Sequence, residues 1–276
     1  MKNILKCGIN SNMLKTIAII AMVIDHIGFY FSSTLPNVLY IACRCIGRIA
    51  MPIFVYLLVQ GFFHTKNFRK YVFRVGILAV ITQILVTILM LINITFMPDY
   101  TLAKQVYMEG NILFAFVVSL SALKILHEDV LIKKWDYNKN LSLKIIAVVV
   151  IFIASILIPI DYGIEVLILS ILMYYVEKIR IQIYIEKSRG NNVLKSVLLN
   201  NISDSRLKMI YLLLILFILS ILLIYFNSYW TVLLAIIPIA LYNGERGKMN
   251  LKYVYYIAFP VQHVLLYLLA MTTMLT

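Results

Sequence analysis

The residues of this sequence best placed to do chemistry are two histidines within apolar segments. His26 follows Asp25 inside the run from Lys15 to Phe31, which reads KTIAIIAMVIDHIGFYF, and His263 lies in the last apolar segment. An ionisable side chain at membrane depth costs a few kcal/mol or more, so it is usually retained for function. Histidine exchanges a proton near neutral pH, which suits it to deprotonate an attacking amine or hydroxyl. We expect the two histidines at similar depths, which indicates a shared site; helix–helix hydrogen bonding is the alternative for His26.

The spacing of Lys15 and His26 places them on nearly the same face of one helix. They are eleven residues apart, which is close to three helical turns and about 16 Å along the axis. Lys15 lies at the boundary of the apolar run, where a lysine either anchors the helix or reaches an anionic headgroup or ligand. Asp25 faces about 100° away from His26, so it cannot orient this histidine from within the helix.

Two arginines, Arg44 and Arg48, share one face of the next apolar segment because they are four residues apart. They lie at the end of the segment that we assign to the outer side, where basic residues are avoided. Arginine is suited to bidentate pairing with a carboxylate or phosphate. The pattern therefore predicts a partner, which is Asp25, Asp161 or an anionic ligand. An ion pair between helices and a ligand contact explain it equally well.

The composition requires a membrane protein. Of the 276 residues, 63% are hydrophobic and 13% are charged, which lies outside the range of soluble globular domains. A spanning helix needs about 20 mostly apolar residues. We predict a single all-α domain over residues 1–276, a polytopic bundle of about nine transmembrane helices. The expected segments are 13–31, 43–63, 75–97, 111–127, 143–160, 162–177, 209–226, 229–242 and 253–275.

Some of these segments and their connections have further expected features. Only Asp161 separates the fifth segment from the sixth, which predicts a tight turn or a broken pair of helices. The eighth segment is short for a span, which predicts a tilted or partly inserted helix. Two basic polar stretches, 124–142 and 178–208, read as inner connectors, the second with a short interfacial helix over 180–198.

The distribution of charge predicts the topology. With the N-terminus inside, all 25 Lys and Arg residues except Arg44, Arg48 and Lys104 fall on the cytosolic side. This bias fits an N-in, C-out protein of the cell membrane with an odd number of spans. The net charge of +13 is thereby explained by topology, and we expect no nucleic-acid partner. The first apolar run lacks a small-residue cleavage pattern, so we expect no cleavable signal peptide.

Cysteine usage predicts neither a disulfide framework nor a metal centre. The three cysteines are Cys7, Cys43 and Cys45, an odd and sparse set. The two histidines at one depth are only a weak metal signal, because neither the ligand spacing nor the carboxylate ligands of a metal site are specified.

Further candidate residues lie near the expected helix ends. Basic side chains in the loop after Gly61 and in the run LYNGERGK would attract a cytosolic phosphate, although the positive-inside rule alone explains them equally well. Asn111 is the first residue of the fourth segment, and the run DYG follows the fifth segment. Glu245 can pair with Arg246. The residues of this group are Lys66, Arg69, Lys70, Arg246, Asn111, Asp161, Tyr162 and Glu245.

The motifs, taken in order, resemble the TraX family. They are MLKTIAIIAMVIDHIGFYF, RCIGRIAMPIFVYLLVQGFFHTKNFRKYVFR, DYG, YNGERG and YYIAFPVQH, from about residue 13 to 268. The family is associated with N-acetylation of conjugative pilin subunits. It is also similar to the wider transmembrane acyltransferases, including the acyltransferase-3 proteins. Those carry a basic residue and a histidine on the first helix, which Lys15 and His26 match; many relatives have arginine in place of the lysine.

The resemblance implies an acetyltransferase that uses cytosolic acetyl-CoA, and we expect no metal. By this resemblance His26 is the catalytic base or a transient acetyl carrier, His263 and Asp25 position the reacting groups, and Arg48 or Arg44 stabilises the oxyanion or holds the acceptor. The acceptor is a peptide or pilin-like amino terminus, or a glycan hydroxyl, and oligomerisation is left open. The residues that would bind the phosphates of coenzyme A are Lys15, Lys66, Arg69, Lys70 and Arg246.

Two other functions are compatible with the same residues. A proton- or ion-coupled transporter would use Asp25, His26, Asp161 and His263 as a relay. A non-catalytic assembly or immunity factor would need neither histidine for its function.

Overall fold

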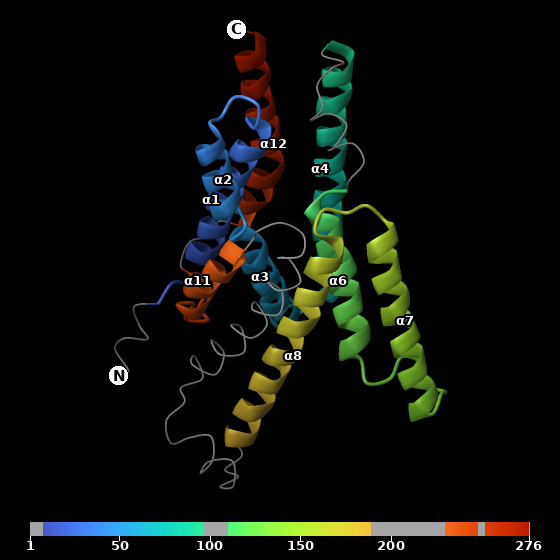
Figure 1. The fold of residues 1–276 in the computed structure, drawn as a ribbon. Helices are drawn as coiled ribbons and strands as arrows, with labels where there is room; N and C mark the ends of the chain where they lie inside the picture. The colour runs from blue at the N-terminus through green and yellow to red at the C-terminus, as the bar shows by residue number, and fades with distance from the viewer. Residues whose placement is uncertain (1–7, 97–109, 189–229, 248–251, 276) are drawn as a thin grey trace.

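The described chain is built from helices. The computed structural model describes residues 8–96, 110–188, 230–247 and 252–275 (Figure 1). Strand-like pairing in this part of the chain is limited to two isolated bridges, Ile9 with Tyr242 and Gly110 with Ile160. The helices are α1 (Ser11–Tyr30), α2 (Asn37–Gly47), α3 (Ala50–His64), α4 (Phe68–Phe96), α6 (Ile112–His127), α7 (Tyr137–Leu157), α8 (Gly163–Ser188), the 3-10 helix η2 (Trp230–Ala235), α11 (Ile236–Ala240) and α12 (Lys252–Leu275).

Five stretches of the described chain are long and apolar enough to cross a membrane. α7 illustrates the pattern best, because large apolar side chains such as Ile145, Val149 and Phe152 are exposed along it. A helix with apolar side chains on its exposed faces is more stable in lipid than in water. The chain is therefore an all-helical membrane protein. The five stretches are Ser11–Tyr30, Asn37–His64, Phe68–Leu89, Tyr137–Leu157 and Val254–Thr273.

The expected segment 43–63 lies within the membrane-length stretch Asn37–His64, but the structure divides this stretch into two helices. α2 ends at Gly47 and α3 begins at Ala50. Proline lacks the backbone N–H that a continuous helix needs. Pro52 therefore cannot donate to the carbonyl of Arg48, four residues earlier, and instead occupies the first turn of α3, where proline is tolerated. The break places Arg48 at the junction of the two helices.

Two other expected elements also differ from the structure. The segment predicted to span over 229–242 is the short pair η2 and α11, followed by a turn, which is too short to cross a bilayer. α8 continues to Ser188, so it runs well past 177 into the expected connector 178–208 and the expected interfacial helix 180–198. The rest of that connector and the predicted segment 209–226 lie outside the described residues.

The tight turn predicted around Asp161 is present. α7 ends at Leu157 and α8 begins at Gly163, and Tyr162 between them adopts a left-handed backbone with φ 53°. The turn is fastened to the start of α6, because the Gly110 amide donates to the Pro159 carbonyl at 2.8 Å and the Asp161 amide donates to the Gly110 carbonyl at 2.8 Å. α7 and α8 therefore form an antiparallel pair beside α6.

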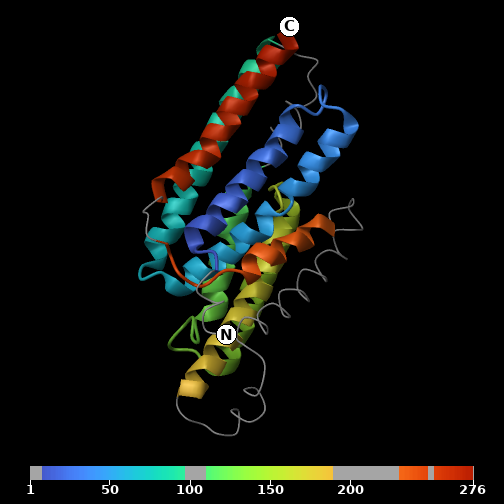
Figure 2. The ribbon, with the colours of Figure 1, turned by 90° about the vertical axis from the view of Figure 1, so that its left-hand side faces the viewer.

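The main core lies where α1, α3, α6 and α8 meet. Leu14 and Ala18 of α1, Val55 of α3, Leu120 of α6 and Tyr174 of α8 are all essentially inaccessible to solvent. Around this core, α2 and α12 pack on α1, and α12 also contacts α4. Figure 2 shows α12 running alongside α4 and α1 beside α2.

α1 and α2 approach each other closely at small residues. A side chain at position 47 would overlap the side chain of Asp25, and one at position 28 would meet the Cβ of Cys43 at 2.8 Å. The glycines at these two positions let the two backbones come together, as small residues commonly do in membrane helix pairs.

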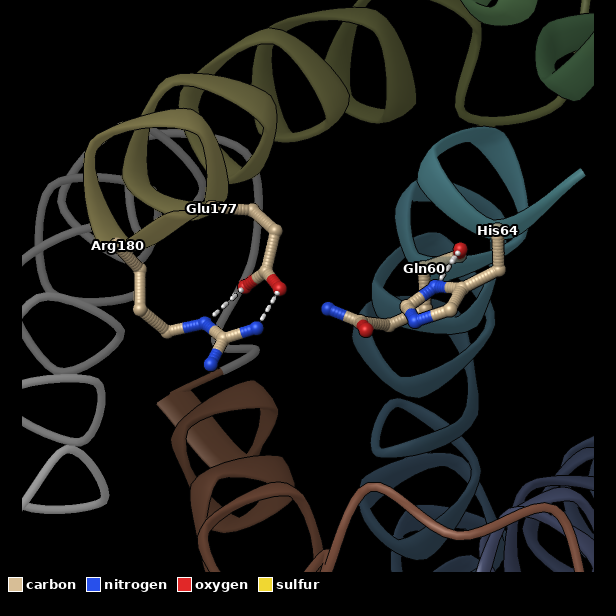
Figure 3. Close-up of polar contacts among 4 residues, drawn as sticks. All are labelled: Gln60, His64, Glu177 and Arg180. Carbon is tan, nitrogen blue, oxygen red and sulfur yellow. Dashed lines mark hydrogen bonds and ion pairs between the residues drawn. The ribbon is translucent and has the colours of Figure 1, made fainter. Parts of the chain in front are cut away.

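A cluster of polar side chains lies between α3 and α8, on a face of α3 other than the one that lines the cavity described below (Figure 3). Glu177 is 3% exposed and is held by Arg180, whose Nε donates to the carboxylate at 3.1 Å. The Gln60 amide is directed from α3 toward this pair. The Nδ1 of His64 lies 2.8 Å from the Gln60 carbonyl. The cluster buries an ion pair at the helix interface.

Replacing Gly47 by alanine is expected to destabilise the protein, because the added methyl group overlaps Asp25. Overpacking of this kind costs typically about 1–3 kcal/mol. The measurement is the free energy of unfolding from denaturation with sodium dodecyl sulfate in mixed micelles. Gly76→Ala on α4 is the matched control, because its new Cβ would meet only Val117 at 3.9 Å. Equal stability of the two variants would contradict the close approach of α1 and α2.

Replacing Glu177 by glutamine is expected to lower the free energy of unfolding, because it leaves Arg180 without its carboxylate. Removing one partner of a fully buried pair costs about 3–5 kcal/mol, and we expect roughly 2 kcal/mol here since the Arg180 side chain is 32% exposed. The control is Glu128→Gln, which breaks the exposed pair with Lys124 and should change stability by less than about 1 kcal/mol. A Glu177 variant as stable as the Glu128 variant would show that the buried pair is dispensable.

Candidate functional site

The candidate site is a cavity of about 550 Å³ bounded by α1, α3, α4, α6 and α12. Its walls are mostly apolar and include Met22, Phe54, Leu57, Val75 and Phe259. This volume lies within the range of about 300–1,000 Å³ that small-molecule and cofactor pockets occupy. The cavity therefore combines a size suited to a ligand with the polar groups described next.

Two histidine rings lie in contact in the wall of this cavity. The ring centroids of His26 and His263 are 4.4 Å apart with an interplanar angle of 52°. The Nδ1 of His26 is buried without a hydrogen-bond partner, and the Gln262 amide lies next to this ring without a hydrogen bond of good geometry. α1 and α12 thus bring together the two histidines, which are far apart in the sequence.

Asp25 pairs with Arg44 rather than with a histidine. The carboxylate accepts a hydrogen bond from the Arg44 guanidinium at 2.9 Å, and the side chains are only 16% and 19% exposed. The guanidinium also lies over the ring of Phe29, 5.9 Å from its centroid. Of the partners considered for Arg44, the structure has Asp25, and this pair links α1 to α2.

Arg48 is 6% exposed and lies in the cavity wall. Its guanidinium is 5.3 Å from the ring centroid of Tyr162. Asp161 and Asn111 line the same part of the cavity. A guanidinium buried in this way presents several N–H donors to a group bound in the cavity.

Asn111 has a clear structural role at its position. Its side-chain oxygen caps α6 by accepting from the Leu113 amide at 3.1 Å, and its nitrogen donates to the Ala79 carbonyl of α4 at 2.9 Å. The Gln83 side-chain oxygen accepts from the Asn111 backbone amide at 3.0 Å. Asn111 therefore fixes the start of α6 against α4 at one wall of the cavity.

Lys15 lies in the cavity wall near the start of α1, several turns from His26. Its Nζ is 5.6 Å from the ring centroid of Tyr255 on α12. The Tyr255 hydroxyl in turn donates to the Asn12 carbonyl at 3.0 Å, which ties α12 to the start of α1. Arg246 lies within electrostatic range of Lys15, so this part of the cavity is positively charged.

Several predicted site residues lie outside the cavity wall. The side chains of Lys66, Arg69 and Lys70 are exposed around the start of α4, and those of Glu245 and Arg246 are exposed after α11. Glu245 contributes its backbone instead, because its carbonyl accepts from the Ser11 amide at 2.8 Å. The predicted pairing of Glu245 with Arg246 is absent from the ion pairs of the described residues.

Three residues of this region on α12 and α1 were not among the predicted site residues. They are Tyr255 beside Lys15, Gln262 beside His26, and Tyr30, whose hydroxyl is 2.9 Å from the Nδ1 of His263. The sequence does contain a signal for Tyr255. Tyr255, Phe259 and His263 follow one another at intervals of four residues, which places them on one helix face.

Within the described residues, no group of three or more His, Cys, Asp or Glu side chains is arranged to hold a metal ion. Cys43 and Cys45 are free thiols, and Cys7 lies outside the described residues.

The comparison with protein families matches the profile described as "TraX protein" to residues 10–270. This match covers nearly the whole chain, so the chain belongs to the TraX family. No solved structure shows significant similarity to it.

Two curated proteins are similar to parts of the chain. One, from Dichelobacter nodosus, bears the name "Probable fimbrial assembly protein FimC, serogroup H1" and is 36% identical over 112 residues, which are 41% of this chain and 44% of that protein. The other is an uncharacterised protein of Rickettsia prowazekii (strain Madrid E), 41% identical over 78 residues, which are 28% of this chain and 27% of that protein. The chain thus matches less than half the length of either relative.

Proposed function

We propose that this TraX-family chain is a membrane-embedded acetyltransferase. It moves an acetyl group from cytosolic acetyl-CoA to an amine or hydroxyl of a membrane-associated or extracytoplasmic acceptor. The main support for the proposal is that Lys15, His26 and His263 line one cavity. A cation for the donor's phosphates and a pair of imidazoles for proton transfer thereby share one apolar chamber.

The proposal includes a topology. The N-terminus and Lys15 face the cytosol, and the C-terminus lies outside the cell membrane. The charge bias of the sequence supports this orientation, and the five membrane-length apolar stretches are compatible with it.

The donor would enter along α1 from the Lys15 side. Lys15, with Arg246 nearby, supplies positive charge for a phosphate group. The exposed cations Lys66, Arg69 and Lys70 would attract the nucleotide part of coenzyme A outside the cavity. Between Lys15 and His26 the helix rises about 16 Å, a length comparable with that of an extended pantetheine arm. The apolar walls then surround this arm and bring the thioester to the histidines.

The reaction needs a base beside the thioester carbon. His26 accepts the proton from the acceptor's N–H or O–H as its nitrogen or oxygen bonds to the acetyl carbon. The carbon–sulfur bond then breaks, and the thiolate takes the proton from His26 to leave as coenzyme A. Arg48 would donate to the oxyanion of the tetrahedral intermediate, because its buried guanidinium lies in the same wall. Atoms and charge balance without a further reactant.

A pilin or other peptide amino terminus is the first acceptor to test, with a surface glycan hydroxyl as the second. The relative from Dichelobacter nodosus is named as a probable fimbrial assembly protein, which supports a pilin-related acceptor. Asp161 and Tyr162, at the turn between α7 and α8, lie in the cavity wall and are our candidates for contact with it. The Tyr162 backbone is left-handed, and such strained positions concentrate at functional sites.

Replacing His26 by alanine is expected to lower turnover at least about 100-fold, because general base catalysis contributes about 10²–10⁴ to a rate. The measurement is thiol release from acetyl-CoA by purified protein with a pilin-derived peptide, with acetylated peptide detected by mass spectrometry.

The matched control is His127→Gln, since His127 is exposed and lies outside the cavity wall. Wild-type turnover in the His26 variant would refute the proposed base. Ion flux in liposomes without acetyl-CoA, together with no acetylated peptide, would favour a transporter instead.

Replacing Lys15 by glutamine is expected to raise the KM for acetyl-CoA by about tenfold or more and to leave kcat nearly unchanged. A hydrogen bond to a charged group is worth about 1.5–3 kcal/mol, and a contact made equally in the ground and transition states affects KM alone. Steady-state kinetics over a range of acetyl-CoA concentrations test this.

Lys15→Arg should retain most of the affinity, and Lys139→Gln, an exposed change on α7, should have no effect. An unchanged KM in Lys15→Gln would remove Lys15 from the donor site.

A further inference from the structure

The contact between His26 and His263 raises the question of which histidine acts as the base. Both rings line the cavity, and their centroids are 4.4 Å apart. Two imidazoles this close cannot both hold an extra proton at low cost, so they titrate as a coupled pair. A defined base therefore requires a difference between the two rings in which nitrogen carries the hydrogen.

Tyr30 supplies such a difference. Its hydroxyl oxygen is 2.9 Å from the Nδ1 of His263, and its side chain is buried, with the residue 3% exposed. A phenol is a strong donor and a weak acceptor, whereas the unprotonated nitrogen of a neutral imidazole is a strong acceptor. The favoured arrangement therefore has the Tyr30 hydroxyl donating to Nδ1, which leaves the hydrogen of neutral His263 on Nε2.

The two histidines then differ in their free lone pairs. His263 has its Nδ1 lone pair occupied by Tyr30 and its Nε2 protonated, so the neutral ring offers only a donor. The buried Nδ1 of His26 has no hydrogen-bond partner, so no hydroxyl occupies its lone pair. Neutral His26 can therefore carry its hydrogen on Nδ1 and keep Nε2 unprotonated for the acceptor's proton. We propose that Tyr30 is a positioning residue that fixes the tautomer of His263 and thereby leaves His26 as the base. The role of His26 as the base rests on the proposed acetyl transfer. The tautomer of His263 does not depend on that proposal.

A merely structural role for Tyr30 would be to fasten α1 to α12. The structure contains a matched example of such a tie, because the Tyr255 hydroxyl on α12 donates to the Asn12 carbonyl in the first turn of α1 at 3.0 Å. Tyr255 lies two turns before His263 on the same helix face and makes its hydroxyl contacts with Asn12 and Thr16. Tyr255→Phe therefore removes a tie between the same helices without touching a histidine.

The direct test is nitrogen NMR of the full-length protein labelled with ¹⁵N-histidine in nanodiscs. The chain has four histidines, so single His→Asn variants assign the imidazole signals. In the wild type at neutral pH we expect His263 with Nδ1 unprotonated and Nε2 protonated. Tyr30→Phe should convert this signal to the other tautomer or a mixture, whereas Tyr255→Phe should leave it unchanged. A wild-type His263 protonated on Nδ1, or a tautomer that Tyr30→Phe does not alter, would overturn the proposal.

Steady-state kinetics test whether Tyr30 supports the role of His26 as the base. Tyr30→Phe is expected to lower kcat for peptide acetylation about tenfold, a part of the about 10²–10⁴ that general base catalysis supplies, with the KM for acetyl-CoA unchanged. Wild-type kcat in this variant would overturn the positioning role. If wild-type protein releases no thiol and acetylates no acceptor, the proposed function fails, and the NMR result alone then decides the tautomer assignment.

Discussion

The arrangement of this protein depends on the cost of keeping ionisable side chains among apolar helices. A charged or hydrogen-bonding group without a partner in such surroundings costs several kcal/mol, so each must find a partner or face a cavity. Asp25 is held by Arg44 at 2.9 Å, and Arg48 lies over Tyr162. The histidines of α1 and α12 meet each other, and Tyr30 holds the second of them. These contacts bring α1, α2, α12 and the turn before α8 together at the wall of one cavity.

The same constraint explains local features of the backbone. Pro52 interrupts the helix after α2, and this break sets Arg48 at the junction, in the cavity wall. Gly47 leaves room for Asp25, so the ion pair forms where α1 and α2 are closest. The left-handed Tyr162 sits in a turn fastened by hydrogen bonds to Gly110. Small sequence features thus place the polar groups of the cavity.

Part of this arrangement could be predicted from the sequence. α1, α7 and α12 correspond to long apolar runs, and the similar depths expected for His26 and His263 agree with their contact. The spacing of Lys15 and His26 could be converted into a distance because both lie on one regular helix. The turn at Asp161 was visible as a single polar residue between two apolar runs.

The remainder depended on contacts that a single sequence does not specify. Apolar composition alone does not distinguish the broken pair α2–α3 from one helix, and only Pro52 signalled the break. The predicted segment ends at 177 because charged residues follow it, whereas α8 continues to Ser188. Lys66, Arg69 and Lys70 were grouped with Lys15 by charge, yet only Lys15 lines the cavity. Tyr30 and Gln262 were missed because their importance comes from residues on another helix.

The central claim is that the cavity between Lys15 and His26 receives the acetyl donor. The most direct measurement is an electron cryomicroscopy map of the full chain in nanodiscs with coenzyme A added, compared with a map without it. We expect added density for the pantetheine arm inside the cavity, with the thiol beside His26 and a phosphate beside Lys15. Coenzyme A density elsewhere on the protein, with the cavity identical in the two maps, would contradict it.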